Sequence, residues 1–232
     1  LACLVLFGAC GAPGLNIEYY RDIDQRILRG DFEGAQKRVM ESRKELYGDK
    51  SHVVFLMDNA MIELLAGRYA EAVRRVDEAE KAIEELYTKS LTREAASFLS
   101  SDAILPYEGE DYEKVFLNVV GALGYALLGK PDEAIVEAKR ADLKLAEIRR
   151  VHPKNAYSDD GFVRYLMGLM YEGGGETNDA WVSYAQAIRV YEAQAPAFGV
   201  VAPVQLVRRA FACARRLGFK EEAEDLQKRY PA

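Results

Sequence analysis

Five glycines are each followed, five residues later, by an alanine, and this recurrence constrains the fold more than any other feature. The pairs are Gly30/Ala35, Gly67/Ala72, Gly129/Ala134, Gly175/Ala180 and Gly218/Ala223. Glycine suits the left-handed residue that ends a helix. A small residue lets two helices approach closely where they cross. The recurrence therefore predicts a repeat protein built of helical hairpins.

The residues upstream of three alanines add to this pattern. Arg164-x2-Met167-Gly168-x2-Tyr171 leads to Ala180, Leu56-x2-Asn59-Ala60 leads to Ala72, and Ala122-x2-Tyr125 leads to Ala134. The arrangement resembles the tetratricopeptide repeat (TPR), which has a large residue, a Leu-Gly pair and a Tyr on its first helix and a small alanine on its second. The resemblance implies an all-α fold, an irregular right-handed superhelix of about five TPR-like hairpins. Irregularity is expected because the alanine-to-alanine steps are 37, 62, 46 and 43, whereas the family repeats every 34 or so residues.

The predicted repeat domain spans residues 17–232. Its hairpins are expected at 17–29 with 32–47, 53–66 with 69–87, 111–128 with 131–148, and 204–217 with 220–230. These four pairs of ranges are the first, second, third and fifth hairpins. The fourth hairpin is expected to begin at Ser158-Asp159-Asp160 and to turn at residues 172–175. It ends in a break at 195–203, which contains two prolines. The helix at 111–128 is apolar almost all round, so neighbouring helices should cover it in the middle of the stack.

An insertion is predicted at residues 88–110, between the second and third hairpins. It contains three candidate contact residues, Ile104, Leu105 and Tyr107. Long segments that break a repeat are commonly functional, because a loop reaches solvent or a partner at little cost. The alternative is that these three side chains only pack the insertion onto the neighbouring helices.

The chain opens with an apolar run, LACLVLFGAC, that ends in small residues and Cys10. This run resembles the end of a bacterial lipoprotein signal peptide, which implies a signal remnant at 1–9, lipidation of Cys10 and a tether at 10–16. Gly11 resembles the sorting signal for the outer membrane. The expected location is therefore the bacterial cell envelope, as an outer-membrane lipoprotein that faces the periplasm. The alternatives are a core helix or an ordinary cleaved signal.

The stretch Y-E-G-E-D-Y-E-K-V at residues 107–115 is rich in acids. It resembles the signature of a family of predicted bacterial lipoproteins, from which no activity carries over. Glu108, Glu110, Asp111 and Glu113 crowd the expected start of a helix, where unpaired amides and the helix dipole stabilise anions. Helix capping is the favoured interpretation. The alternative is a metal or catalytic cluster, for which no His or Cys lies near.

Composition excludes some partners. The net charge of −6 disfavours nucleic acid and an anionic membrane surface as the main partner. Of the three cysteines, Cys3 would leave with the signal and Cys10 would carry lipid, so Cys213 has no disulfide partner. We expect Cys213 to act as a small buried hydrophobe.

No catalytic motif is complete. Gly124-x4-Gly129-Lys130 imitates a phosphate-binding loop, but Pro131 stands where a Ser or Thr would hold magnesium. His52 and His152 are the only histidines, and each is isolated. The chain is therefore expected not to be an enzyme and to use no metal and no cofactor.

Binding remains as the expected function. Nine apolar residues occupy the first-helix positions that would face an inner groove: Val54, Met57, Met61, Phe116, Val119, Leu123, Phe162, Tyr165 and Leu169. An apolar groove suits a protein partner, so we predict a scaffold in the envelope. The alternatives are a carrier of hydrophobic cargo, such as lipid or an unfolded envelope protein, and a groove that the chain itself fills. A set of arginines at 208, 209, 215 and 216 could receive an acidic partner or form a solvated face.

Overall fold

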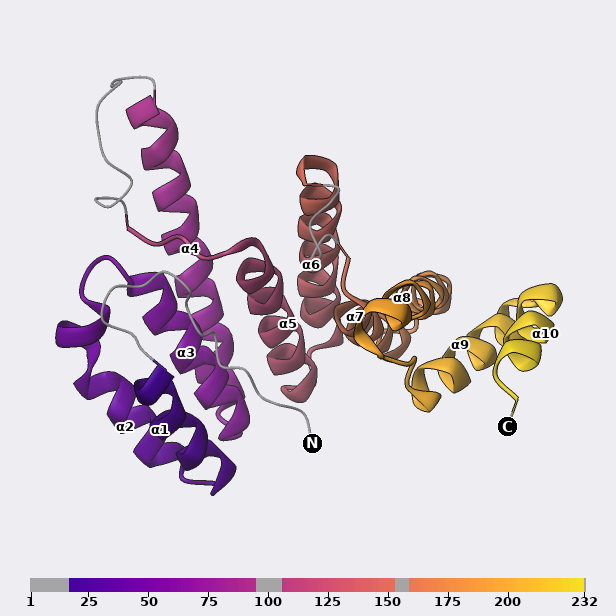
Figure 1. Ribbon diagram of the computed structural model, residues 1–232, viewed down its shortest axis with the longest axis horizontal. Helices are drawn as coiled ribbons and strands as arrows, with labels where there is room; N and C mark the ends of the chain where they lie inside the picture. The colour runs from indigo at the N-terminus through magenta and orange to yellow at the C-terminus, as the bar shows by residue number, and fades with distance from the viewer. Residues whose placement is uncertain (1–16, 95–105, 153–158, 232) are drawn as a thin grey trace. The chain divides into compact units, whose positions relative to one another are not determined.

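The computed structural model describes residues 17–94, 106–152 and 159–231, and all regular secondary structure in these ranges is helical (Figure 1). The chain divides into two compact units, unit 1 at residues 1–128 and unit 2 at residues 129–232. The prediction of an all-α chain of helix hairpins is confirmed.

Unit 1 contains α1 (Ile17–Leu28), α2 (Phe32–Glu41), a short π-helix η1 (Arg43–Tyr47), α3 (His52–Leu65), α4 (Tyr69–Glu94) and α5 (Asp111–Leu127). The helices α1 and α2 form one antiparallel pair, α3 and α4 form the next, and α5 packs against α3 and α4. Helix α4 continues to Glu94, beyond the predicted end at Tyr87. The sequence after Tyr87 contains no glycine or proline before Glu94, so no residue there ends the helix.

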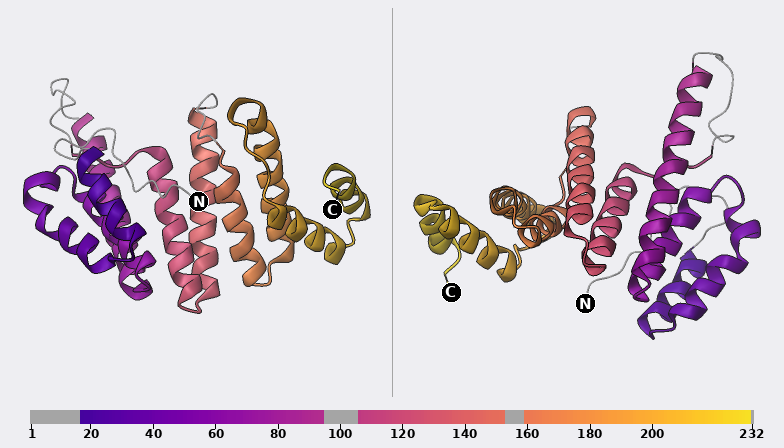
Figure 2. Two further views of the ribbon diagram at one scale, coloured as in Figure 1. Left: turned by 60° about the horizontal axis from the view of Figure 1, so that its bottom comes forward. Right: turned by 180° about the vertical axis from the view of Figure 1, so that it is seen from behind.

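Unit 2 contains α6 (Pro131–Val151), α7 (Gly161–Gly173), α8 (Thr177–Phe198), α9 (Val204–Leu217) and α10 (Lys220–Arg229). Each helix packs against the next along the chain (Figure 2). The break predicted to begin at residue 195 begins after Phe198, because α8 includes Pro196 in its last turn. Gly199, in the left-handed conformation with φ of 64°, then ends the helix.

The glycines and alanines of the recurring pairs occupy the positions that the sequence predicts. Gly30, Gly67, Gly129, Gly175 and Gly218 all have positive φ, between 72° and 83°. The five alanines that follow them are buried, namely Ala35, Ala72, Ala134, Ala180 and Ala223. A side chain at these glycines would strain the backbone, so the glycine is required by the turn.

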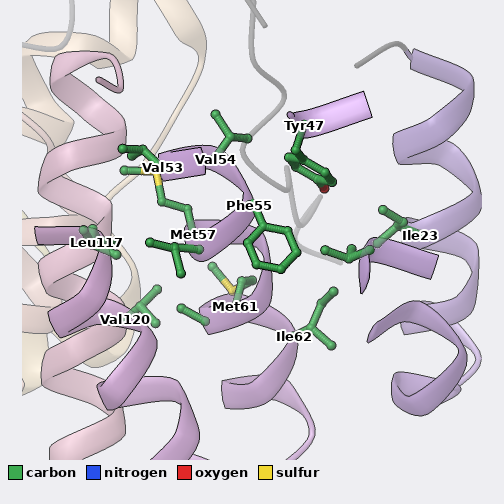
Figure 3. Close-up of a cluster of buried hydrophobic side chains, with 14 of the residues drawn as sticks. Ile23, Tyr47, Val53, Val54, Phe55, Met57, Met61, Ile62, Leu117 and Val120 are labelled. Atoms are coloured by element: carbon green, nitrogen blue, oxygen red, sulfur yellow. The ribbon is translucent and has the colours of Figure 1, made fainter. Parts of the chain in front are cut away.

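The core of unit 1 is a continuous cluster of aliphatic, aromatic and methionine side chains. Residues of α1, α3 and α5 meet there, with Ile23, Phe55, Met57 and Leu117 almost wholly enclosed (Figure 3). Burying such a side chain contributes about 1.5–3 kcal/mol. Unit 1 therefore has its own hydrophobic core.

The core of unit 2 includes a buried arginine, Arg164, at the position where the TPR pattern has a large residue. Arg164 on α7 is 2% exposed and pairs with Asp159 at 2.8 Å and with Asp142 of α6. A buried charge needs such partners, because removal from water is otherwise costly. The ion pairs therefore join α6 to the start of α7.

Within the described residues, no helix combines the length and the apolar character needed to cross a membrane.

Candidate functional site

The nine residues predicted to line an inner groove are in large part core residues. Val54, Met57 and Met61 belong to the buried cluster of unit 1, which also contains side chains of α1 and α5 (Figure 3). These three side chains therefore do not line an open groove. The physical reason is that α3 packs against α2, α4 and α5, so its apolar side chains are enclosed on several sides.

The other six predicted residues are more varied. On α5, Val119 is buried, whereas Phe116 and Leu123 are half-buried, with Phe116 packed against the core cluster. On α7 of unit 2, Tyr165 and Leu169 are half-buried, and Phe162 is the most accessible at 46% exposed. Each unit thus uses most of these side chains for its own packing.

The acidic motif at residues 107–115 has a structural role. Glu113, which is fully buried, accepts hydrogen bonds from the Tyr107 hydroxyl at 2.5 Å and from the Glu110 backbone N–H at 2.8 Å. The Tyr107 N–H donates to the Lys50 carbonyl oxygen at 2.8 Å. The motif therefore caps α5 and fastens the chain before it to the loop that precedes α3.

Two of the predicted insertion contacts, Ile104 and Leu105, lie outside the described residues. The third, Tyr107, is half-buried against the core of unit 1. Cys10 also lies outside the described residues. In the described ranges, no group of three or more His, Cys, Asp or Glu side chains could hold a metal ion.

A buried carboxyl group in unit 1 was not predicted. Asp58 on α3 is 1% exposed, and its Oδ2 accepts hydrogen bonds from the Tyr47 hydroxyl at 2.6 Å and the Tyr20 hydroxyl at 3.2 Å. The pKa of the Asp58 carboxyl is raised to about 7, mainly by burial and in smaller part by the nearby Glu113, whereas the two tyrosine hydroxyls lower it. The group is enclosed, so its protonation state affects the stability of unit 1.

A groove between α8 and α10 of unit 2 is the best candidate site. Its volume is about 470 Å³, within the range of roughly 300–1,000 Å³ that is usual for ligand sites. Apolar residues of both helices line it, namely Trp181, Val182, Ala185, Ile188 and Leu226. Charged residues complete the lining, namely Arg189, Glu221, Glu222, Asp225 and Arg229.

Local sequence explains why α8 has two apolar faces. Tyr184 and Ala187 are buried within unit 2, on the side that meets α7. Trp181, Ala185 and Ile188 follow a helical spacing of four and three residues, so they share a second stripe. The Trp181 ring lies 6.0 Å from that of Phe219, centroid to centroid, in an edge-to-face arrangement at the start of α10.

One end of the groove is closed by ion pairs. Arg229 of α10 lies 2.6 Å from Glu192 of α8 and 2.7 Å from Asp225, and the Tyr230 hydroxyl donates to Glu192 at 2.8 Å. These contacts fix α10 to α8 near the far end of α10. They also neutralise Asp225 and Arg229.

Three charges on the groove remain available to a partner. Glu221 and Glu222 stand in the first turn of α10, on the side of Trp181 and Phe219, and form no ion pair with any residue that the structure describes. Arg189 is exposed, and its one hydrogen bond to the described part of the chain goes to the Ala185 carbonyl oxygen, at 3.3 Å. The groove therefore carries negative charge beside its tryptophan and positive charge farther along α8.

Sequence reasoning placed the binding surface on the first helices of the hairpins, whereas this groove lies between two second helices. The available signal was Trp181, the only tryptophan of the chain, directly after the crossing alanine Ala180. Of the predicted arginine set, Arg209 is engaged by Glu172 at 2.8 Å. One of the four arginines of that set is therefore already paired.

No protein-family model matches the chain, and no curated protein matches it either. Several solved structures share its fold, RapI and BtubC among them. The apo form of RapI superposes with a TM-score of 0.62 at 12% identity, over 91% of this chain and 51% of RapI. BtubC from P. vanneervenii superposes with a TM-score of 0.66 at 18% identity, over 91% of this chain and 76% of BtubC. The chain thus spans about half of RapI, and both similarities support a TPR-like helical-repeat fold.

Proposed function

We propose that this chain is a non-catalytic scaffold of the bacterial cell envelope that binds a protein partner in the groove between α8 and α10. The observation that carries the proposal is the groove itself, which combines an apolar floor with Trp181 and three charges that no described residue pairs. Apolar anchors inside a polar rim are the usual composition of a protein-binding surface.

The core packing of unit 1 favours a scaffold over a carrier of hydrophobic cargo. A carrier needs a sizeable apolar cavity, and the side chains that suggested one, Val54, Met57 and Met61, are buried in the core. The groove in unit 2 has charged residues on both walls, which suits a peptide more than a lipid chain.

The expected lack of enzymatic activity is part of the same proposal. Its support is that Glu113 of the acidic motif already accepts two hydrogen bonds and holds a helix start. Metal analysis of the purified protein tests this point. A stoichiometric bound ion would contradict it.

The envelope location rests on the sequence at residues 1–11. We propose that Cys10 is lipidated and that the anchor holds the protein in the outer membrane, on the periplasmic side. Mass spectrometry of protein made from the full-length precursor in a bacterial host tests the lipidation of Cys10. Fractionation of the same cells tests the membrane location. A diacylated N-terminus at Cys10 is expected, and a Cys10→Ser variant should retain the unprocessed segment. Recovery of the protein in the membrane-free fraction with an unmodified N-terminal segment would contradict the envelope location.

Site-specific crosslinking in cells tests the scaffold. A photo-crosslinking residue in place of Val182, which lines the groove and is 43% exposed, should give one discrete crosslinked protein. Val136 on α6 is the matched control, because it is also a valine in a helix of unit 2 and is 48% exposed, but lies outside the groove. Identical crosslinks from both positions would contradict binding in the groove.

A further inference from the structure

We infer that the partner presents an amphipathic helix to the α8–α10 groove, with a lysine or arginine placed beside Trp181, Glu221 and Glu222. This inference rests on the proposed function and specifies the chemistry of the partner. It follows from the backbone, the length and the charge distribution of the groove.

The backbone of the groove favours a helical ligand over an extended one. Both walls are α-helices, whose backbone N–H and C=O groups along the groove are already paired within each helix. An extended peptide would therefore find no backbone partners and would bury unpaired polar groups. A helical peptide satisfies its own backbone, so it only has to match side chains.

The length of the apolar stripe sets the size of the contact. The stripe on α8 runs from Trp181 to Ile188, which corresponds to roughly 10 Å at about 1.5 Å per residue. A ligand helix of about two turns covers that distance and presents apolar residues at i, i+3, i+4 and i+7. Ile188 of α8 and Leu226 of α10, which are 1% and 3% exposed, close the bottom of the groove beneath that contact.

The charges of the groove define the polar flank of the ligand. Glu221 and Glu222 are exposed and unpaired among the described residues, and they lie at the end of the groove where Trp181 contacts Phe219. Two carboxylates beside an indole ring attract a cation through ion pairing and through the ring face. Arg189, toward the other end, suits an acidic residue of the same helix.

Two synthetic peptides serve as probes. Each is stapled into a helix of about 14 residues, roughly four turns, with leucines at i, i+3, i+4 and i+7. One has lysines beside the apolar stripe, and the other has glutamates at the same positions. Because Trp181 is the only tryptophan, the fluorescence of the intact protein reports occupation of the groove directly. We expect the lysine peptide to change this emission and to bind at least threefold more tightly than the glutamate peptide.

A charge-swap variant provides the decisive comparison. The double substitution Glu221→Lys and Glu222→Lys should lower the affinity for the lysine peptide by roughly three- to tenfold, as expected for exposed ion pairs. It should raise the affinity for the glutamate peptide. Both acids also stabilise the start of α10, so circular dichroism must show that the variant remains folded. The control is Glu224→Lys, an exposed position on α10 outside the groove, which should leave both affinities unchanged.

The outcomes separate this inference from the proposed function. If each peptide bound the wild type and the charge-swap variant with the same affinity, the assigned partner chemistry would be wrong. Binding of an unstapled, proline-containing control peptide as tightly as the stapled one would overturn the helical ligand. In either case, a discrete crosslink from Val182 would leave the scaffold proposal standing. Loss of that crosslink as well would end the proposed function.

Discussion

At the scale of single residues, the buried polar groups of unit 1 matter most for stability. Asp58 accepts two tyrosine hydroxyl groups at Oδ2, whereas its Oδ1 has no hydrogen-bond partner among the described residues. A charged carboxylate in this setting is poorly solvated, and Glu113 and Asp24 add like charge near it. The protonated form of Asp58 is therefore favoured in the folded state.

The sign of the pH dependence follows from that preference. The pKa of Asp58 is raised by burial to about 7 in the folded protein, whereas an exposed aspartate titrates near pH 4 or so. The stabilising effect is complete below the unfolded pKa and is lost as the pH rises toward 7. We expect the free energy of unfolding to fall across this window, by up to about 1.4 kcal/mol per pH unit.

An Asp58→Asn variant should flatten this dependence, because asparagine still accepts the tyrosine hydroxyl groups but does not titrate. Urea unfolding, followed by far-UV circular dichroism at several pH values between about 4 and 7, measures the difference from the wild type. Asp49→Asn is the control, since Asp49 is exposed on the same unit. A variant whose slope equals that of the wild type would show that Asp58 does not carry the effect.

At the scale of helices, the crossing of α7 and α8 depends on a glycine. A Cβ atom at Gly168 would overlap the ring of Tyr184, which is fully buried and whose hydroxyl donates to Glu172 at 2.6 Å. Tyr184 therefore has little freedom to move aside. The TPR-like pattern correctly placed Gly168 near this crossing, because the need for a small residue is local in sequence.

A Gly168→Ala variant should destabilise unit 2 by about 1–3 kcal/mol through overpacking, despite the better helix propensity of alanine. Gly173→Ala is the matched control on the same helix, because a Cβ there meets no heavy atom within 4 Å. It should be neutral or stabilising by up to about 1 kcal/mol. Urea unfolding followed by Trp181 fluorescence measures both variants. Equal stabilities would rule out the clash as the reason for glycine.

Helix boundaries were predictable where a glycine marks the turn, and less so at Pro196 or where neither glycine nor proline occurs. The starts and ends of α5, α9 and α10 agree with the prediction to within one residue. Helix α4 runs seven residues further than predicted, from Tyr87 to Glu94, and α8 passes through Pro196. A proline in the last turn removes a donor but leaves the preceding helix intact, so it is a weaker stop signal than glycine.

At the scale of the whole molecule, the chain has two units that each contain a core. Asp58 belongs to unit 1, whereas Gly168 and Trp181 belong to unit 2. We expect Gly168→Ala to lower the urea midpoint of the Trp181 fluorescence transition and Asp58→Asn to leave it unchanged. The effects of the two substitutions on the free energy of unfolding should add to within about 0.5 kcal/mol. A shift of the Trp181 midpoint by Asp58→Asn would show that the units unfold together.

The amino-acid sequence by itself determined the helical hairpins, the turns and the buried crossing alanines, because these depend on residues within a few positions of one another. Only the tertiary structure decided which apolar faces remain open. Met57 and Trp181 are both apolar residues at helical spacing, yet one fills the core of unit 1 and the other lines the groove of unit 2. Burial depends on which helices pack together, and helical periodicity alone does not specify the neighbour.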